Sequence, residues 1–192
     1  MKALNYTLRS AVFLAFAFFC SSLTCDMLGD ATDVTLNVQL THTFVVDERA
    51  DSKGNPVSYS KVEVINADDN ADFKEIKSRI KDITITKVTY SASDYAADGK
   101  VTFTNGKGSF STTESGAPFA TANLEFQDIQ TAASGGTVYT LALDDSGLSQ
   151  VAKNLKDAGT VYMKASGTFS KTPVAFKVKV KLDCKVTASP VK

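Results

Sequence analysis

The 192-residue chain is poor in the residues from which most catalytic and metal sites are built. It has no tryptophan, one histidine, three cysteines and four prolines, and its 21 basic residues match its 21 acidic ones. A single histidine, His42, without a CxxC motif offers no ligand set for a transition metal and little material for general-base catalysis. The balanced charge argues against nucleic acid as a partner. No nucleophile-elbow or phosphate-loop motif occurs, so we expect no catalytic activity and no cofactor.

The N-terminus has the pattern of a secretory signal. Lys2 and Arg9 precede an unbroken apolar run at 11–19, and small polar residues follow it. Nine helical residues rise only about 13–14 Å, less than half the roughly 30 Å hydrocarbon core of a bilayer, so the run is too short for a permanent span. We therefore predict a signal peptide at 1–24 and an exported protein.

The processing site decides whether the protein is tethered. If Cys25 becomes the first mature residue, its thiol can carry a lipid, and residues 25–32 form a polar spacer before a single domain at 33–188. Cleavage near Ser22 would instead release a soluble protein. Cys184 lies among the apolar residues of a predicted strand, where a buried cysteine needs no partner, but a Cys25–Cys184 disulfide is an alternative in an oxidising compartment. We favour the lipid anchor, with an outer-membrane or periplasmic location.

Residues 33–188 show mainly the two-residue apolar alternation of β-strands. The expected strands cover 34–46, 57–64, 83–90, 101–104 with a return through 110, 118–126, 137–143, 161–169 and 174–186. Asn105-Gly106 is typical of a two-residue hairpin turn, and a change of parity near Thr86 or Lys87 predicts a bulge. This pattern favours a mainly β protein, an antiparallel β-sandwich of immunoglobulin-like general architecture, with a closed barrel as the alternative.

Two short helices are expected between the strands. The first follows a cap at Asp69 or Asn70, and apolar residues at helical spacing continue it as far as Ile80. The second follows a cap at Asp145 or Ser146 and ends at a glycine, Gly159. The stretch at 131–136 contains two glycines and is expected to be a flexible connection.

The last strand carries the candidate interaction surface. Its apolar residues occupy one face, and the other face carries a stripe of four lysines, Lys177, Lys179, Lys181 and Lys185. Such a stripe can meet anionic lipid headgroups, a glycan or the acidic face of a partner. It is also the ordinary solvated face of an antiparallel strand, which is the interpretation that the balanced charge favours.

The other polar groups are weaker candidates for a binding site. The acidic clusters at 47–51, 68–72 and 144–145 lack the spacing of a calcium loop, so no metal site is expected. Exposed tyrosines can form a platform for sugars, but several of the tyrosines at 59, 90, 95, 139 and 162 share the parity of core residues.

Five segments spread over most of the mature chain share a family pattern: Cys25-Asp26 after the signal, DVTLNVQLTHTFVV, IKSRIKDITITKVTY, VAKNLKDAGTVYMKASGTF and VKLDCKVTASP. In these segments the chain resembles small uncharacterised bacterial cell-envelope lipoproteins with a predicted β-sandwich domain. The resemblance implies a Gram-negative envelope location and no known activity or site.

Taken together, these features predict a lipid-anchored binding or structural module without catalytic activity. Its partners would be the membrane through the N-terminal lipid and another envelope protein or a glycan. Three alternatives are a periplasmic carrier of a lipid or other apolar ligand, a secreted soluble domain with the Cys25–Cys184 disulfide, and a hydrolase that uses paired aspartates.

Overall fold

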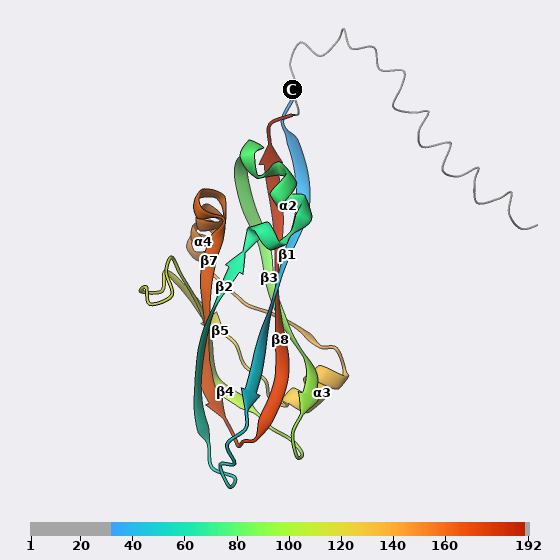
Figure 1. Ribbon diagram of the computed structural model, residues 1–192, viewed down its shortest axis with the longest axis vertical. Coiled ribbons are helices and arrows are strands. Elements are labelled where there is room, and N and C mark those ends of the chain that lie inside the picture. The colour runs from blue at the N-terminus through green and yellow to red at the C-terminus, as the bar shows by residue number, and fades with distance from the viewer. Residues whose placement is uncertain (1–31, 191–192) are drawn as a thin grey trace, which may run out of the picture. The chain divides into compact units, whose positions relative to one another are not determined.

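The computed structural model describes residues 32–190, so the predicted signal peptide, Cys25 and most of the spacer lie outside the described residues. Eight antiparallel strands form two four-stranded sheets that pack face to face (Figure 1). The strands are β1 (Val34–Glu48), β2 (Val57–Asn66), β3 (Ile80–Ala96), β4 (Phe103–Ser111), β5 (Ala120–Asn123), β6 (Val138–Thr140), β7 (Thr160–Phe169) and β8 (Val174–Ala188). The expected mainly β sandwich is thereby confirmed.

The strand order defines the fold as a jelly roll. One sheet has the order β1-β8-β3-β6 and the other has the order β2-β7-β4-β5. The first strand pairs with the last, the second with the seventh, the third with the sixth and the fourth with the fifth. This nested pairing is the double Greek key of an eight-stranded jelly roll, which refines the expected immunoglobulin-like arrangement and differs from a closed barrel.

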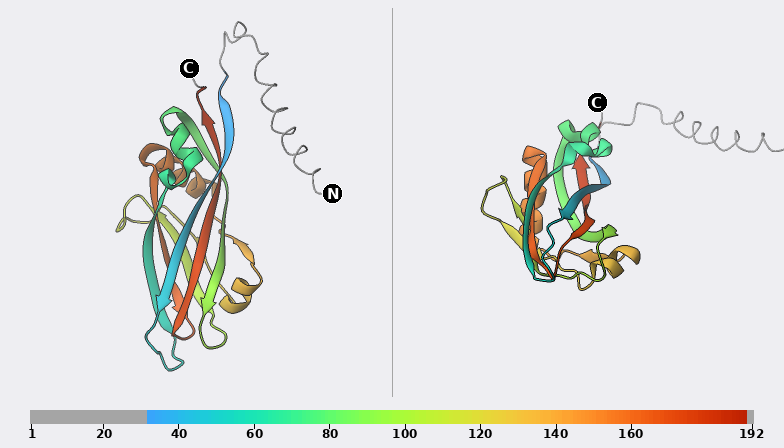
Figure 2. Two further views of the ribbon diagram at one scale, coloured as in Figure 1. Left: turned by 45° about the vertical axis from the view of Figure 1, so that its right-hand side comes forward. Right: turned by 60° about the horizontal axis from the view of Figure 1, so that its bottom comes forward.

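The two ends of the sandwich differ. Val34 at the start of β1 pairs with Ala188 at the end of β8, so the described chain enters and leaves at the same end (Figure 2). The connections at 49–56, 97–102 and 170–173 gather at the opposite end. The chain therefore enters the domain at the end remote from these three loops.

The alternating side chains of β8 contribute to the core between the two sheets. Every second residue from Val174 to Ala188 is buried, including Cys184 at 3% exposure. These residues face an aromatic cluster between the sheets, in which the ring centroids of Phe103 and Phe169 are 4.8 Å apart. The cavity within this cluster has a volume of about 10 Å³, the space of a single water molecule. At this cluster the two sheets leave no room for a lipid.

The bulge predicted in β3 is confirmed, whereas the hairpin turn predicted at Asn105-Gly106 is wrong. The register of β3 against β8 shifts between Ile85 and Lys87, which is the predicted bulge. Asn105-Gly106 does not turn the chain, because β4 continues through it and forms a bulge opposite β7. Asn105 takes a φ of 52°, and a Cβ atom on Gly106 would lie 1.8 Å from the carbonyl oxygen of Leu124. The pair therefore allows a bend and a close backbone approach where a hairpin was expected.

The expected helices form with shifted boundaries. Asn70 caps α2 (Ala71–Ile76), because its side chain accepts a hydrogen bond from the backbone N–H of Phe73 at 2.9 Å. Short 3₁₀ turns, η1 (Ala67–Asp69) and η2 (Lys77–Arg79), flank this helix, and Ile80 already belongs to β3.

The cap of α4 (Asp145–Ala158) is Asp144, one residue before the predicted position, and its carboxylate accepts from the N–H of Gly147 at 2.6 Å. Gly159 ends α4 with a φ of 73°, as predicted.

Between β5 and β6 the chain differs most from expectation. The predicted strands at 118–126 and 137–143 are reduced to the short β5 and β6, and part of the expected flexible connection forms α3 (Ile129–Ser134) behind a cap at Asp128. None of the helices among residues 32–190 is both long enough and apolar enough to cross a bilayer.

Candidate functional site

The predicted lysine stripe lies at the centre of one outer surface. Because β8 pairs with β1 on one side and with β3 on the other, its outward side chains share a face with theirs. We call the outward surface of the β1-β8-β3-β6 sheet the lysine face. Its cross-strand rows are Val45–Lys177–Ser93, Thr43–Lys179–Ser91–Val138, Thr41–Lys181–Thr89–Thr140, Gln39–Asp183–Lys87 and Asn37–Lys185–Thr84.

The lysine face carries charges of both signs. It adds Lys87 to the four predicted lysines, and it also holds four acids, Asp47, Asp82, Asp94 and Asp183. The ammonium group of Lys177 lies 2.8 Å from Asp94, whereas Asp183 accepts a hydrogen bond from Gln39 at 2.7 Å. Within residues 32–190, the other four lysines of this face form no ion pair. The unpaired charge therefore sits on the middle of the sheet.

Exposed apolar side chains lie on the same face. Val138 on β6 is 64% exposed and Val45 on β1 is 50% exposed, the two largest values among the large apolar residues of the described chain. Val138 is in the row of Lys179, and Val45 is in the row of Lys177. The sequence analysis missed both valines, because only the strand register shows that they flank the lysines.

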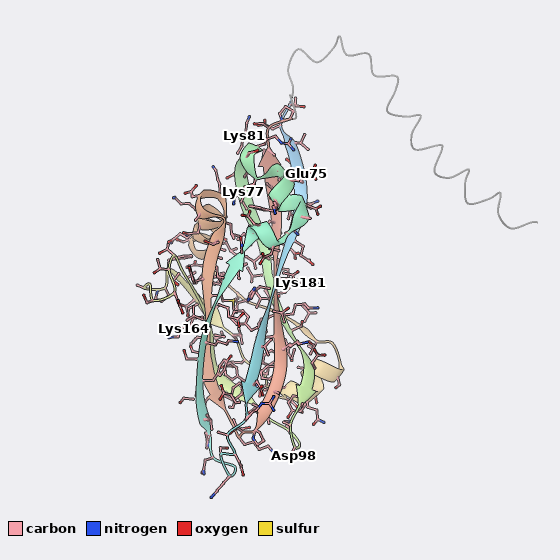
Figure 3. The ribbon with its side chains drawn as sticks, in the orientation of Figure 1. Glu75, Lys77, Lys81, Asp98, Lys164 and Lys181 are labelled. Atoms are coloured by element: carbon pink, nitrogen blue, oxygen red, sulfur yellow. The ribbon has the colours of Figure 1, made fainter. Side chains whose placement is uncertain are left out.

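The outer surface of the second sheet serves as a natural comparison. Its central strands carry Lys107 on β4 and Lys164 on β7, and Lys107 donates a hydrogen bond to Asn123 at 2.6 Å. Figure 3 shows Lys164 and Lys181 on the two different sheets. This surface has fewer lysines, but its outward strand rows contain no acidic residue, so it is no less positive than the lysine face.

The only histidine belongs to a polar network where the edge strands β1 and β2 meet. His42 Nε2 lies 2.6 Å from Glu63 Oε2, and the ammonium group of Lys61 lies 2.7 Å from the other oxygen of Glu63. Burial raises the pKa of Glu63, but hydrogen bonds with Lys61 and His42 outweigh burial and hold this pKa below its ordinary value. A groove of about 330 Å³ beside the network is also lined by Tyr162 and Glu114. The network joins two strands and contains no nucleophile.

The acidic clusters have structural partners. Asp68 pairs with Lys77 at 2.7 Å, Asp47 pairs with Arg49 at 2.8 Å, and Asp144 caps α4. In the part of the chain that the structure describes, no three histidine, cysteine or acidic side chains lie close enough together to hold a metal ion.

Two of the tyrosines belong to the core. Tyr59 and Tyr90 are 8% and 6% exposed. Burial, together with the negative charges of Glu48 and Glu63, raises the pKa of Tyr59 to about 12. Tyr162 is half-buried on the outer side of β7, and so it is available as a surface aromatic residue.

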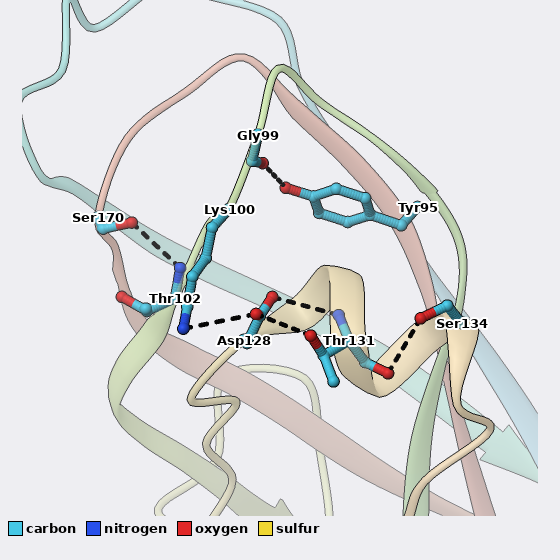
Figure 4. Close-up of polar contacts among 8 residues, drawn as sticks. All are labelled: Tyr95, Gly99, Lys100, Thr102, Asp128, Thr131, Ser134 and Ser170. Atoms are coloured by element: carbon cyan, nitrogen blue, oxygen red, sulfur yellow. Dashed lines mark hydrogen bonds and ion pairs between the residues drawn. The ribbon is translucent and has the colours of Figure 1, made fainter.

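Two loops of the remote end, 97–102 and 170–173, are connected by a hydrogen bond (Figure 4). The hydroxyl of Tyr95 donates to the carbonyl of Gly99 at 2.5 Å, and the N–H of Thr102 donates to the side chain of Ser170 at 3.1 Å. Asp128 accepts from Thr131 within α3 and lies 3.4 Å from the ammonium group of Lys100. The hydrogen bond from Thr131 is the main reason why the pKa of Asp128 is below its ordinary value. These contacts fix the loops to one another and to α3.

Cys184 faces the core of the sandwich, as its parity predicts. Burial raises the pKa of its thiol to about 12, so the reactive thiolate is scarce at neutral pH. Cys25 lies outside the described residues, and both its acylation and its pairing with Cys184 stay predictions.

Comparison with known proteins adds the following. No protein-family model matches the sequence, and no curated protein matches it. Among solved structures, the semi-empty VLP of the giant freshwater prawn Macrobrachium rosenbergii nodavirus is 11% identical with a TM-score of 0.39, over 84% of this chain and 96% of that chain. The decameric BFDV capsid protein is 12% identical with a TM-score of 0.41, over 81% and 99%. Desmodium yellow mottle tymovirus is 8% identical with a TM-score of 0.38, over 89% of each chain. Because these scores are below 0.5, the assignment as a jelly roll rests on the strand order of the chain itself.

Proposed function

We propose that the protein is an exported, lipid-anchored module of the cell envelope that acts by binding and has no catalytic activity. The observation that carries this proposal is the order of features along the chain. A positively flanked apolar run at 11–19 is followed by Cys25, by a short polar stretch and then by the first residues of the fold. A lipid on Cys25 would hold such a domain at the membrane.

The geometry of the domain supports a tether of this kind. The spacer of residues 25–32 can extend about 26–29 Å at the usual rise of an extended chain. It would join the domain next to the Val34–Ala188 pair, which leaves the loops of the other end directed away from the point of attachment. The domain can thus stay close to the bilayer and still present its long sheet surfaces.

The reactive side chains of the domain have structural roles, which supports a function in binding. His42 and Glu63 connect two edge strands, and Asp144 caps a helix. Cys184 is buried with a raised pKa, which suppresses its nucleophilic form. These groups therefore serve the fold, which suits a role in binding better than covalent chemistry.

The mass of the mature protein tests this proposal. We expect the protein isolated from its natural membrane to begin at Cys25 and to carry the added mass of acyl chains. Globomycin, which blocks the lipoprotein signal peptidase, should leave the signal attached, and Cys25→Ala should abolish the acylation.

Two results would contradict the anchor. An unmodified chain that starts near Leu23 would show ordinary secretion. A mature chain whose mass and thiol titration in denaturant indicate no free thiol would show the Cys25–Cys184 disulfide.

A further inference from the structure

We propose that the groove between β3 and α4 binds an extended segment of another polypeptide, which adds to the open edge of β3 as a further strand. The proposal rests on the binding role in the proposed function and names the class of partner. The groove has a volume of about 520 Å³. It is lined by residues 82–85 of β3 and by a stripe of α4 that includes Leu148, Ser149 and Ala152.

The edge of β3 that borders this groove has no strand partner among residues 32–190. β8 pairs with β3 from Ile80 to Ala96, whereas β6 pairs with it on the other side only from Thr89 to Ser91. Residues 82–85 therefore have a neighbouring strand on one side only. Such an edge presents backbone N–H and C=O groups with which another chain can pair.

A hydrogen bond of Val88 shows how the backbone groups alternate along β8. The carbonyl of Val88 accepts from the N–H of Leu141 at 2.9 Å, so the backbone groups of Val88 point away from β8. Val88 lies opposite Leu182, and because such a pair exchanges no hydrogen bonds, the backbone groups of Leu182 point toward β1. The direction alternates along a strand, so the backbone groups of Cys184 and Val186 also point toward β1.

The same rule gives the direction of the backbone groups beside the groove. Ile83 lies opposite Val186, and Ile85 lies opposite Cys184. The N–H and C=O groups of both isoleucines therefore point away from β8 and into the groove, whereas those of Thr84 point toward β8. Within the described chain, no other strand or loop bonds to these four groups of Ile83 and Ile85. Two donors and two acceptors at alternate positions match the backbone of one added strand.

The lining residues show that the groove runs along the edge of the sheet and not over one of its faces. Buried and exposed side chains alternate over residues 82–85, yet all four line the groove. Only an edge adjoins both faces of a strand. Across the groove, α4 contributes the half-buried Leu148 and the small Ala152. An added strand can therefore place every second side chain against these apolar residues.

The size of the groove favours a single extended segment over a second folded copy. Four residues of strand measure about 13 Å at roughly 3.3 Å per residue. An edge of this length offers far less area than the roughly 800 Å² per partner of a stable interface between folded proteins. Because α4 forms the opposite wall, a partner must enter as one strand without a sheet behind it.

The charges that line the groove favour a segment with a basic residue. The carboxylates of Asp82, Asp145 and Asp157 stand against the ammonium groups of Lys153 and Lys156. Lys153 and Asp157 are paired at 2.6 Å. This pairing leaves two carboxylates and one ammonium group, an excess of one negative charge. The partner is therefore an extended segment with apolar side chains at alternate positions and a lysine or arginine among the others.

Amide exchange of the mature protein, followed by NMR, tests the open edge without any ligand. We expect the N–H groups of Ile83 and Ile85 to exchange with deuterium at least tenfold faster than the N–H of Thr84. Equal protection of the three amides would show that the edge is already paired and would overturn the proposal.

Peptides test the occupant. A library of random nine-residue peptides displayed on phage is selected on the immobilised mature protein, and the selected sequences are synthesised. We expect alternating apolar residues with lysine or arginine, and slower exchange of the Ile83 and Ile85 amides when the peptide is added. Each peptide is also made with N-methyl groups on every second residue, in the two possible phases. Because only one phase removes the N–H groups that face β3, calorimetry should show at least a tenfold difference in Kd between the phases.

Variants of exposed residues locate the binding site. Ser149→Trp fills the groove and should abolish peptide binding, whereas Gln150→Trp, one position further along α4 and outside the groove, should leave it unchanged. Asp82→Asn with Asp145→Asn should weaken binding several-fold at low salt and have little effect at high salt.

Several outcomes would overturn the proposal. These are the selection of no peptide, equal effects of the two methylation phases, and binding that persists in Ser149→Trp. A dimer in sedimentation that Ser149→Trp dissociates would assign the groove to a second copy instead. The mass measurement decides the anchor independently, so the proposed function and this inference can fail separately.

Discussion

The two sheets leave two long sides open between them, and the molecule closes these sides by different means. On one side the edge strands β1 and β2 meet, and polar groups join them. Lys61 on β2 donates to the carbonyl of Val45 on β1 at 2.9 Å, and Glu63 connects Lys61 with His42. Asn70 adds a hydrogen bond to the carbonyl of Gln39 at 3.0 Å.

The other side is closed by helices. Val151 and Leu155 of α4 are fully buried, and Ala152 is 4% exposed, where the helix packs on β3, β5 and β7. Ile129 and Ala132 of α3 are similarly buried beside β3. This side therefore removes apolar surface from water. On the side of β1 and β2, α2 buries only Phe73 and Ile76, at one end.

The difference shows that the two closures perform different tasks. Inward-pointing charged side chains and side-chain bonds to edge carbonyls prevent the pairing of β1 with a strand of another molecule. Such contacts add little stability, because partly exposed ion pairs are screened by water and salt. We expect the helical side to supply most of the stability and the polar side to supply most of the protection against aggregation.

The largest expected effect is on the helical side. Leu155→Ala removes a side chain with 0% exposure from α4, and we expect the free energy of unfolding to fall by about 2–5 kcal/mol. Urea denaturation at neutral pH measures this loss. The loss should be independent of salt, since it arises from a cavity. Lys153→Ala on the exposed face of α4 is the control, and an equal loss in both variants would refute the assignment of the buried face.

The next effect is at the start of the same helix. Asp144→Ala removes the acceptor for the N–H of Gly147 and should lower the free energy of unfolding by about 1 kcal/mol. Asp145→Ala, at one of the two positions that the sequence predicts, should change it much less. Thermal or urea denaturation of both variants decides the matter, and a larger loss for Asp145→Ala would place the cap there.

The sequence alone could predict those features of the fold that depend on near neighbours in the chain. The alternation of β8, the apolar stripe of α4 and the glycine that ends it are periodic or local patterns, and the structure confirms them. Local patterns are visible because each depends on neighbours within a few positions.

The features that could not be predicted depend on distant partners. Asn105-Gly106 has the local chemistry of a turn, but the close approach of Leu124 makes it a bulge. The exposed valines join the candidate surface only through the register of β1 and β6 with their neighbours. The pair of His42 and Glu63 likewise needs two strands to meet, so the histidine looked isolated in the sequence.

The smallest expected effect is on the polar side, and it depends on pH. Because the contacts with Lys61 and His42 outweigh burial and hold the pKa of Glu63 below its ordinary value, the folded protein takes up this proton less readily than the unfolded chain. The stabilisation is therefore present at neutral pH and is lost as the pH falls through the lowered pKa. Glu63→Gln should reduce the free energy of unfolding at neutral pH by about 1 kcal/mol or less.

Denaturation of the wild type and of Glu63→Gln across the acid range measures this effect. The difference between them should shrink as the pH falls and should also shrink in high salt, whereas the loss in Leu155→Ala should change with neither. A Glu63→Gln loss that is constant with pH would mean that the side chain acts by packing and not by charge. Aggregation of Glu63→Gln is compared with that of the wild type under conditions where the two have the same free energy of unfolding. Faster aggregation of Glu63→Gln there would show that the polar side protects the edge strands.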